Sequence, residues 1–75
     1  MIKVGQIYKT NDRYKKKIVI SGESFNGCVH FIMQDGCVQY ISKTSLIQDI
    51  QNKFLELIAE YPTWQEAVNS KEFKE

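Results

Sequence analysis

The chain has 75 residues, is 43% hydrophobic and 25% charged, and carries a formal net charge of +1. These values are ordinary for one small globular domain, and no apolar run approaches the roughly 20 residues that a membrane-spanning helix needs. No apolar stretch typical of a signal peptide follows Met1, so we expect a cytoplasmic protein that does not contact a membrane.

The first half of the chain has the alternation of apolar and polar residues that is typical of β-strands. Residues 4–9 predict a first strand, and a turn cluster at 10–12 and a basic segment at 13–17 follow it. Further strands are expected at about 16–24, 28–34 and 37–41. Asn26-Gly27 and Asp35-Gly36 separate these strands and are typical of two-residue hairpin turns.

Both turns predict the same register for the three strands. Counting outward from each turn pairs Phe31 with Tyr40 and Ile20 with Met33, and it places His30 opposite Glu23. Because side chains alternate along a strand, one face of the sheet should be apolar. That predicted face consists of Ile18, Ile20, Val29, Phe31, Met33, Val38 and Tyr40.

The opposite face of this meander is also more apolar than a face that only contacts water. Its predicted apolar residues are Val19, Phe25, Cys28, Ile32, Cys37 and Ile41. Either the C-terminal helices of the same chain cover this face, or a partner protein does. If a partner does, Phe25, Ile32 and Ile41 are candidate protein-binding residues.

The periodicity changes after the last predicted strand. Residues 42–47 predict a single helical turn or a short extra strand. The spacing of Ile50, Phe54, Leu57, Ile58 and Tyr61 then predicts a helix that ends before Pro62. Thr63 and Glu66 form a capping box that predicts a second helix to about Ser70, with Trp64 facing inward, and the charged tail at 71–75 is expected to fray.

These elements predict an α+β fold: a small antiparallel meander or SH3-like half-barrel with two C-terminal helices. We expect one domain over residues 1–75, in which 1–47 form the β meander and 48–75 form a helical extension.

The segment 4–20 contains a Gly-Gln-apolar-aromatic strand, then an Asn-Asp turn, then basic residues that lead into a second strand. This pattern resembles small uncharacterised phage and prophage proteins. The resemblance implies an SH3-like or KOW-like barrel over residues 4–47, with 42–47 as the short helical turn before its last strand. The run at 61–67 resembles tails of phage proteins from Gram-positive bacteria. The motifs that carry the resemblance are turn and strand residues, so they indicate a fold and carry no assigned activity.

Few residues indicate catalysis or metal binding. His30 is the only histidine, and Cys28 and Cys37 are predicted at opposite ends of one hairpin, about 20 Å apart. We therefore expect free thiols, no metal site, no cofactor and no enzymatic activity. A polar pair of His30 with Glu23 across the strands is a simpler interpretation than proton transfer.

The charges divide unevenly along the chain. Residues 1–47 carry seven Lys or Arg and three Asp or Glu, whereas residues 48–75 carry three Lys and six Asp or Glu. The two halves either attract each other, or the basic half binds nucleic acid. The candidate nucleic-acid-binding residues are Lys9, Arg13, Tyr14, Lys15, Lys16 and Lys17, which could equally be a solvated loop that protects a sheet edge.

Two functions remain open from the sequence. The first is a non-enzymatic protein-binding module, such as a phage or prophage accessory protein that acts on a host protein or pairs with its own copy. Trp64 and Phe25 are its first candidate anchors, because aromatic side chains give a large contact area. The alternative is a small nucleic-acid-binding barrel that uses the basic loop at 13–17.

Overall fold

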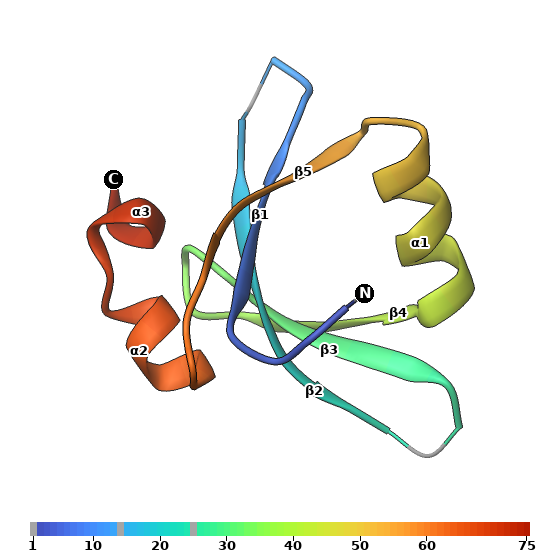
Figure 1. Ribbon diagram of the computed structural model, residues 1–75, viewed down its shortest axis with the longest axis horizontal. Coiled ribbons are helices and arrows are strands. Elements are labelled where there is room, and N and C mark those ends of the chain that lie inside the picture. The colour runs from blue at the N-terminus through green and yellow to red at the C-terminus, as the bar shows by residue number, and fades with distance from the viewer. Residues whose placement is uncertain (1, 14, 25) are drawn as a thin grey trace.

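The computed structural model describes residues 2–13, 15–24 and 26–75. These residues form a small α+β domain with an open five-stranded antiparallel sheet in the order β4-β3-β2-β1-β5 (Figure 1). Helix α1 joins the two edge strands, and two short helices end the chain. The elements are β1 (Gln6–Thr10), β2 (Lys17–Glu23), β3 (Cys28–Met33), β4 (Val38–Ser42), α1 (Lys43–Gln51), β5 (Leu55–Glu60), α2 (Trp64–Val68) and α3 (Lys71–Lys74).

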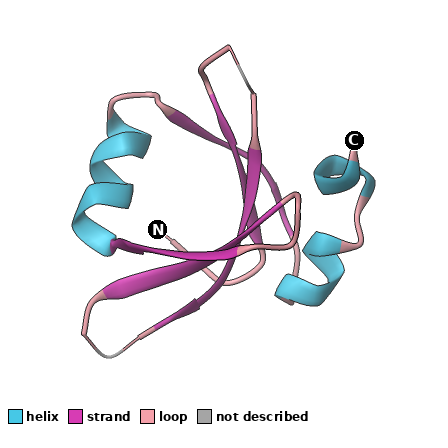
Figure 2. Cartoon of the chain, turned by 180° about the vertical axis from the view of Figure 1, so that it is seen from behind, coloured by secondary structure: helices cyan, strands magenta, loops and turns pink. Residues whose placement is uncertain are grey.

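Helices cover both faces of the sheet, and each face has its own apolar core. Helix α1 lies on one side of the sheet, while α2 and α3 lie on the other (Figure 2). The α1-side core consists of Tyr8, Ile18, Ile20, Val29, Leu46 and Leu55. The α2–α3-side core consists of Ile7, Val19, Ala67 and Phe73. Alternate residues of β1 and β2 therefore point to opposite cores, as strand geometry requires.

Both predicted hairpins are present, but their turns contain three residues rather than two. Gly36 donates its N–H to the Met33 carbonyl, and Met33 donates to Cys37, so Met33 pairs with Cys37. Gly36 has a φ of +91°, which is the left-handed residue of the bulged three-residue turn. The predicted two-residue turn is wrong, and the β3–β4 register moves by one residue.

This one-residue change reverses the faces of β4. Tyr40 lies opposite His30, and Gln39 lies opposite Phe31, so the predicted contact between Phe31 and Tyr40 is wrong. Val38 and Tyr40 leave the predicted apolar face, and Ile41 joins it and packs against the α1-side core. A slip of one residue inverts a strand because side chains alternate with a period of two.

The β2–β3 hairpin has a similar turn, yet its apolar face is as predicted. Ser24 donates to Cys28, and Glu23 rather than Ser24 pairs with Val29. An irregularity between Ile20 and Gly22 then moves the register by one more residue, so Ile18 pairs with Met33. Two shifts restore the original face, and Ile18, Ile20, Val29, Phe31 and Met33 all contribute to the α1-side core. The predicted pairing of Ile20 with Met33 is wrong, and Gly22 instead of Glu23 lies opposite His30.

The predicted helix at 50–61 is wrong. The helix of this region is α1, which begins after Ser42, whose hydroxyl accepts the N–H of Ser45. It ends at Gln51 with Asn52 as its C-cap, and Lys53 takes a φ of +64° before the chain continues as β5. Residues 48–75 are therefore not a purely helical extension, because β5 pairs with β1 as the fifth strand.

The predicted N-cap at Thr63 is confirmed, although α2 ends at Val68 rather than near Ser70, and the predicted fraying of the tail is wrong. The Thr63 hydroxyl accepts the N–H of Glu66 at 3.2 Å and starts α2, and Trp64 packs against the α2–α3-side core. The tail at 71–75 contains α3, and Phe73 is only 4% exposed. Gln34 also donates its amide to the Phe73 carbonyl at 2.8 Å, which ties the β3–β4 turn to α3.

Candidate functional site

The described residues among the predicted nucleic-acid-binding set lie on the β1–β2 hairpin, but two of its lysines are bonded within the chain. Lys9 lies 3.8 Å from the Glu56 carboxylate across the β1–β5 ladder. Lys17 donates its ammonium to the Glu75 carbonyl at 2.9 Å. These two lysines face the same side of the sheet, since they pair directly across β1 and β2. Their cationic groups are therefore partly satisfied within the chain.

The remaining basic residues of the hairpin are exposed. Arg13, Lys15 and Lys16 lie in the connection between β1 and β2, where the Lys15 and Lys16 backbone N–H groups bond to Asp12 and Thr10. Tyr14, the aromatic candidate for base stacking, lies outside the described residues. The exposed basic surface of this hairpin thus contains fewer residues than the sequence predicted.

The three predicted protein-binding residues that the structure describes do not share one surface. Ile41 packs against the α1-side core, whereas Ile32 is half-buried on the opposite face of the sheet, beside Val19. Trp64 is half-buried against the α2–α3-side core. Phe25 lies outside the described residues.

Apart from Val4, which precedes β1 and is 42% exposed, the large exposed apolar side chains lie in two regions that the sequence analysis did not select. One is the edge strand β4, where Val38 is 53% and Tyr40 is 67% exposed. The other lies on α1 and the start of β5, where Ile47 is 39%, Phe54 62% and Leu57 47% exposed. The Ser42 cap was the signal that could have identified Ile47. If a helix is started at Ser42, its periodicity turns Leu46 and Ile50 toward the core and leaves Ile47 at the edge of the core.

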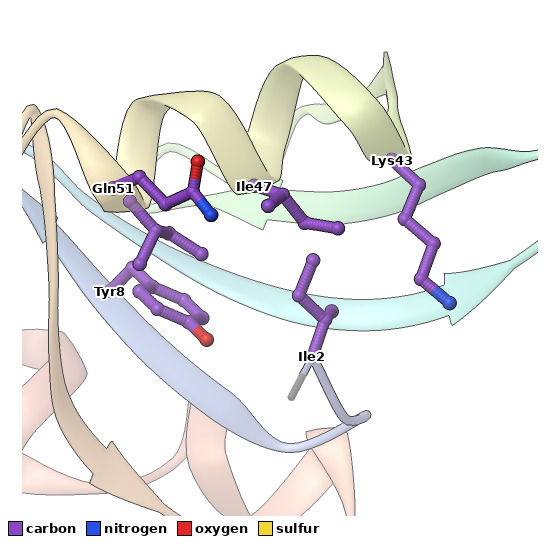
Figure 3. A pocket seen from close by; sticks show the side chains of 6 residues that line it. Ile2, Tyr8, Lys43, Ile47 and Gln51 are labelled. Carbon is purple, nitrogen blue, oxygen red and sulfur yellow. The ribbon is translucent and has the colours of Figure 1, made fainter.

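A pocket of about 370 Å³ opens beside the second group. Its walls are the N-terminal segment, β1 and α1, and its lining residues are Ile2, Tyr8, Lys43, Ile47, Ile50 and Gln51. Figure 3 shows Ile47 and Gln51 extending from α1 toward Ile2 and Tyr8, with Lys43 at one end. Leu57 does not line this α1 pocket, but it lies directly opposite Tyr8 in the β1–β5 ladder and so points to the same side of the sheet. The volume lies within the range of ligand-binding clefts.

A buried polar network fixes the floor of the α1 pocket. The Tyr8 hydroxyl donates to Gln6 Oε1 at 2.8 Å, and the Gln6 amide donates to Glu60 at 3.0 Å. Gln6 Oε1 also accepts the backbone N–H of Lys3 at 2.8 Å. Burial, and then the negative charge of Glu60, raise the pKa of the Tyr8 hydroxyl. The ring of Tyr8 is therefore held neutral and in place, and the network joins β1, β5 and the N-terminal segment.

The polar side chains at the pocket mouth differ in how they are engaged. The Lys43 ammonium lies 3.1 Å from the Glu23 carboxylate and forms an exposed ion pair. The amide of Gln51 has no hydrogen-bond partner among the residues that the structure describes. It can therefore bond to the backbone of a bound segment while apolar side chains fill the pocket.

His30 lines a pocket together with Ser24, Asn26, Cys28 and Tyr40, but among the described residues no hydrogen bond joins its ring to the Ser24 hydroxyl or the Cys28 thiol. The His30 ring packs edge-on against Tyr40, with ring centroids 4.5 Å apart. Both cysteines are free, and Asp35, which accepts the Cys37 backbone N–H at 3.0 Å, raises the pKa of the exposed Cys37 thiol. Within residues 2–13, 15–24 and 26–75, no three His, Cys, Asp or Glu side chains are grouped to hold a metal ion.

Among the described residues, no helix is long and apolar enough to cross a membrane. Comparison of the chain with protein-family models, curated proteins and solved structures gives no match. Only the geometry and chemistry of this chain therefore bear on its function.

Proposed function

We propose that this protein is a non-enzymatic protein-binding module and that its α1 pocket receives an apolar side chain of a partner protein. The observation that carries the proposal is an open pocket of about 370 Å³ with apolar walls, one of which is the exposed side chain of Ile47, while the exposed Leu57 lies on the same side of the sheet. Exposed apolar groups around a concave site are typical of interaction surfaces.

The rigidity of the pocket supports this function. Its floor is the Tyr8 ring, whose hydroxyl is bonded to Gln6, and its roof is α1, which Leu46 anchors in the core. A preformed pocket loses little conformational entropy on binding, so more of the contact energy is retained as affinity. The exposed amide of Gln51 and the ammonium of Lys43 at the mouth can orient a bound backbone.

The strand order is also consistent with an SH3-like barrel, which we propose as the fold type. Four consecutive strands form a meander, β5 returns to pair with β1, and α1 occupies the place of the short helical turn before the last strand. The similarity to phage proteins remains a prediction from the sequence.

A peptide selection tests the proposed function. Random peptides displayed on phage are selected against the whole chain, and the affinity of the enriched peptides is measured by titration calorimetry. We expect the enriched peptides to share an apolar anchor, because burial of one large apolar side chain contributes about 1.5–3 kcal/mol, or roughly 10–100-fold in affinity.

Two variants of α1 provide the matched comparison. Ile47→Glu places a charge in the pocket wall, whereas Gln48→Glu places the same charge on the neighbouring exposed residue, which does not line the pocket. Ile47→Glu should weaken peptide binding at least tenfold, and Gln48→Glu should leave it within about twofold. Equal effects of the two variants, or enriched peptides without an apolar anchor, would contradict the proposal.

Nucleic-acid binding is the second candidate, and the exposure of Arg13, Lys15 and Lys16 at the hairpin favours it. Arg13, Lys15 and Lys16 do not line the α1 pocket, so variants at these positions separate the two functions. The corresponding test is the salt dependence described in the Discussion.

A further inference from the structure

The edge of β4 has hydrogen-bonding groups that no strand of the sheet uses. Met33 donates its N–H to Cys37, so odd-numbered residues of β4 bond toward β3 and even-numbered residues point their backbone groups outward. Val38 and Tyr40 therefore direct their N–H and C=O groups away from the sheet. Both of these residues also have largely exposed side chains.

The β4 edge lacks the usual protection against pairing with another strand. The strand Val38–Ser42 contains no charged residue and no proline, and its ladder with β3 has no bulge. The other edge, β5, carries Glu56 and Glu60 and has a register shift where it pairs with β1. Charges and bulges block edge-to-edge pairing, so only β4 is left open to it.

We propose that two copies of this chain associate through their β4 strands, which pair antiparallel about a two-fold axis at Tyr40. The two sheets then form one continuous ten-stranded sheet. In this register Tyr40 lies opposite Tyr40 of the partner subunit, and Val38 lies opposite Ser42 of the partner subunit. The N–H and C=O groups of Tyr40 then meet those of Tyr40 of the partner subunit, and the outward-pointing N–H of Val38 faces Ser42 of the partner subunit.

The charges next to β4 favour a second copy as the occupant. The two-fold axis brings Lys43, directly after the strand, opposite Cys37 of the partner subunit and near the Asp35 turn of that subunit. The Asp35 carboxylate is exposed, and Lys43 and its present partner Glu23 are both about half exposed. Each end of the interface thus joins an ammonium to a carboxylate, and no two like charges lie opposite each other along the uncharged strand.

The side chains on the α2–α3 side of β4 complete the interface. The Tyr40 ring rests edge-on against His30, which holds it upright on the sheet. Tyr40 of each copy then offers its free side to the other, and Val38 and the half-buried Ile32 extend the apolar strip. Paired aromatic residues across neighbouring strands stabilise a sheet.

Sedimentation equilibrium of charge variants at Tyr40 tests this arrangement. Wild-type protein should be dimeric at sub-millimolar concentration, whereas Tyr40→Lys and Tyr40→Glu should each be monomeric, because each places two like charges side by side. An equimolar mixture of the two variants should form a heterodimer. A monomeric wild type, or a dimer that both variants leave intact, would overturn the proposal.

Disulfide cross-linking tests the register in a background with Cys28→Ser and Cys37→Ser. Tyr40→Cys should give a covalent dimer on mild oxidation, because directly opposite residues have Cα atoms about 5.5 Å apart. Gln39→Cys should give none, because the two copies of residue 39 lie diagonally, about 7–8 Å apart, on the other face. The reverse result would overturn the two-fold axis at Tyr40.

The outcome is separate from that of the proposed function, because β4 does not line the α1 pocket. Tyr40→Lys should remain able to bind the selected peptides, and Ile47→Glu should remain dimeric. A dimer that Ile47→Glu dissociates and Tyr40→Lys does not would overturn the β4 arrangement and assign the α1 pocket to self-association.

Discussion

Leu46→Ala is expected to be the most destabilising single truncation on α1. Leu46 is 0% exposed and is the buried residue of the helix, in contact with the core on the α1 side of the sheet. The neighbouring Ile47 is 39% exposed. Since the two side chains have the same number of carbons, the pair isolates the effect of burial at one place in the helix.

The structure gives an approximate magnitude for each change. Leu46→Ala removes three fully buried carbons, about 2.4 kcal/mol at 0.8 kcal/mol per carbon, and the remaining cavity brings the total to about 3–4 kcal/mol. Ile47→Ala removes carbons that are partly in water, leaves no closed cavity and gains helix propensity, so it should cost about 1 kcal/mol. A domain of this size has a total stability of roughly 4–11 kcal/mol, so the first change removes a large share of it.

Urea denaturation measures both values. The fluorescence of Trp64 reports on the α2–α3-side core, and far-ultraviolet circular dichroism reports on the whole fold. The two transitions should coincide in a cooperative domain, and the Leu46→Ala midpoint should fall well below that of Ile47→Ala. Equal costs, or a larger cost for Ile47→Ala, would refute the placement of α1 at 43–51 with Leu46 facing the core.

Three further outcomes follow from particular contacts. Gly5→Ala should lower the urea midpoint far more than Gly36→Ala. Both glycines have positive φ, but only at Gly5 would the new Cβ collide with a carbonyl oxygen, that of Tyr61. Similar midpoints for the two variants would contradict this close approach of the Tyr61 backbone to Gly5. The raised pKa of Tyr8 means that the folded state holds its proton more tightly than the unfolded state, so stability should fall as the pH rises above the usual tyrosine pKa of about 10. Tyr8→Phe should lose part of that alkaline dependence in denaturation curves at successive pH values, and an unchanged dependence would argue against the buried hydroxyl. If the β1–β2 hairpin binds duplex DNA, the logarithm of the affinity should fall with the logarithm of salt concentration, with a slope of about −0.9 per phosphate contacted. Replacing Arg13, Lys15 and Lys16 together by glutamate should abolish this binding. DNA binding that depends neither on salt nor on these substitutions would exclude the hairpin as the binding site.

The two hairpins show how far local sequence determines this sheet. Asp35-Gly36 correctly marks a turn, but the same dipeptide suits a two-residue turn and the bulged three-residue turn that forms here. Asp35 bonds the Cys37 N–H, and Gly36 takes the left-handed conformation, so these residues stabilise the longer turn. The difference of one residue could not be read from the dipeptide, and it decides whether Tyr40 or Ile41 faces the α1-side core.

The misplaced helix has a different cause. Ile50, Phe54, Leu57 and Ile58 have helical spacing, but the second edge of β1 needs a partner strand, and Leu55–Glu60 supplies it from far along the sequence. The irregularity between Ile7 and Tyr8 lets both Ile58 and Ala59 pack against the α2–α3-side core, which breaks the alternation that would have identified a strand. Only the Ser42 cap and Asn52 were local signals of the actual helix, whereas the α2 capping box needed no distant partner and was predicted correctly.

The sequence analysis missed both candidate surfaces because of these two wrong predictions. The α1 pocket requires α1 to lie over Tyr8 and Ile2, and the exposed β4 edge requires the shifted register. Trp64 was identified as an inward-facing residue from its place after the cap, and it does pack on the core of its own chain. The basic hairpin was recognised from composition alone, but the pairing of Lys9 with Glu56 depends on the β1–β5 ladder and could not be foreseen.

The most direct test of the proposed function is methyl NMR of the wild-type chain during titration with a selected peptide. The α1 pocket predicts that the largest shift changes fall on the methyl groups of Ile2, Ile47, Ile50 and Leu57, while those of Ile32 and Val68 on the other side of the sheet stay in place. Shift changes that avoid the first group and appear instead around the β1–β2 hairpin or Trp64 would contradict the assignment of this pocket as the binding site.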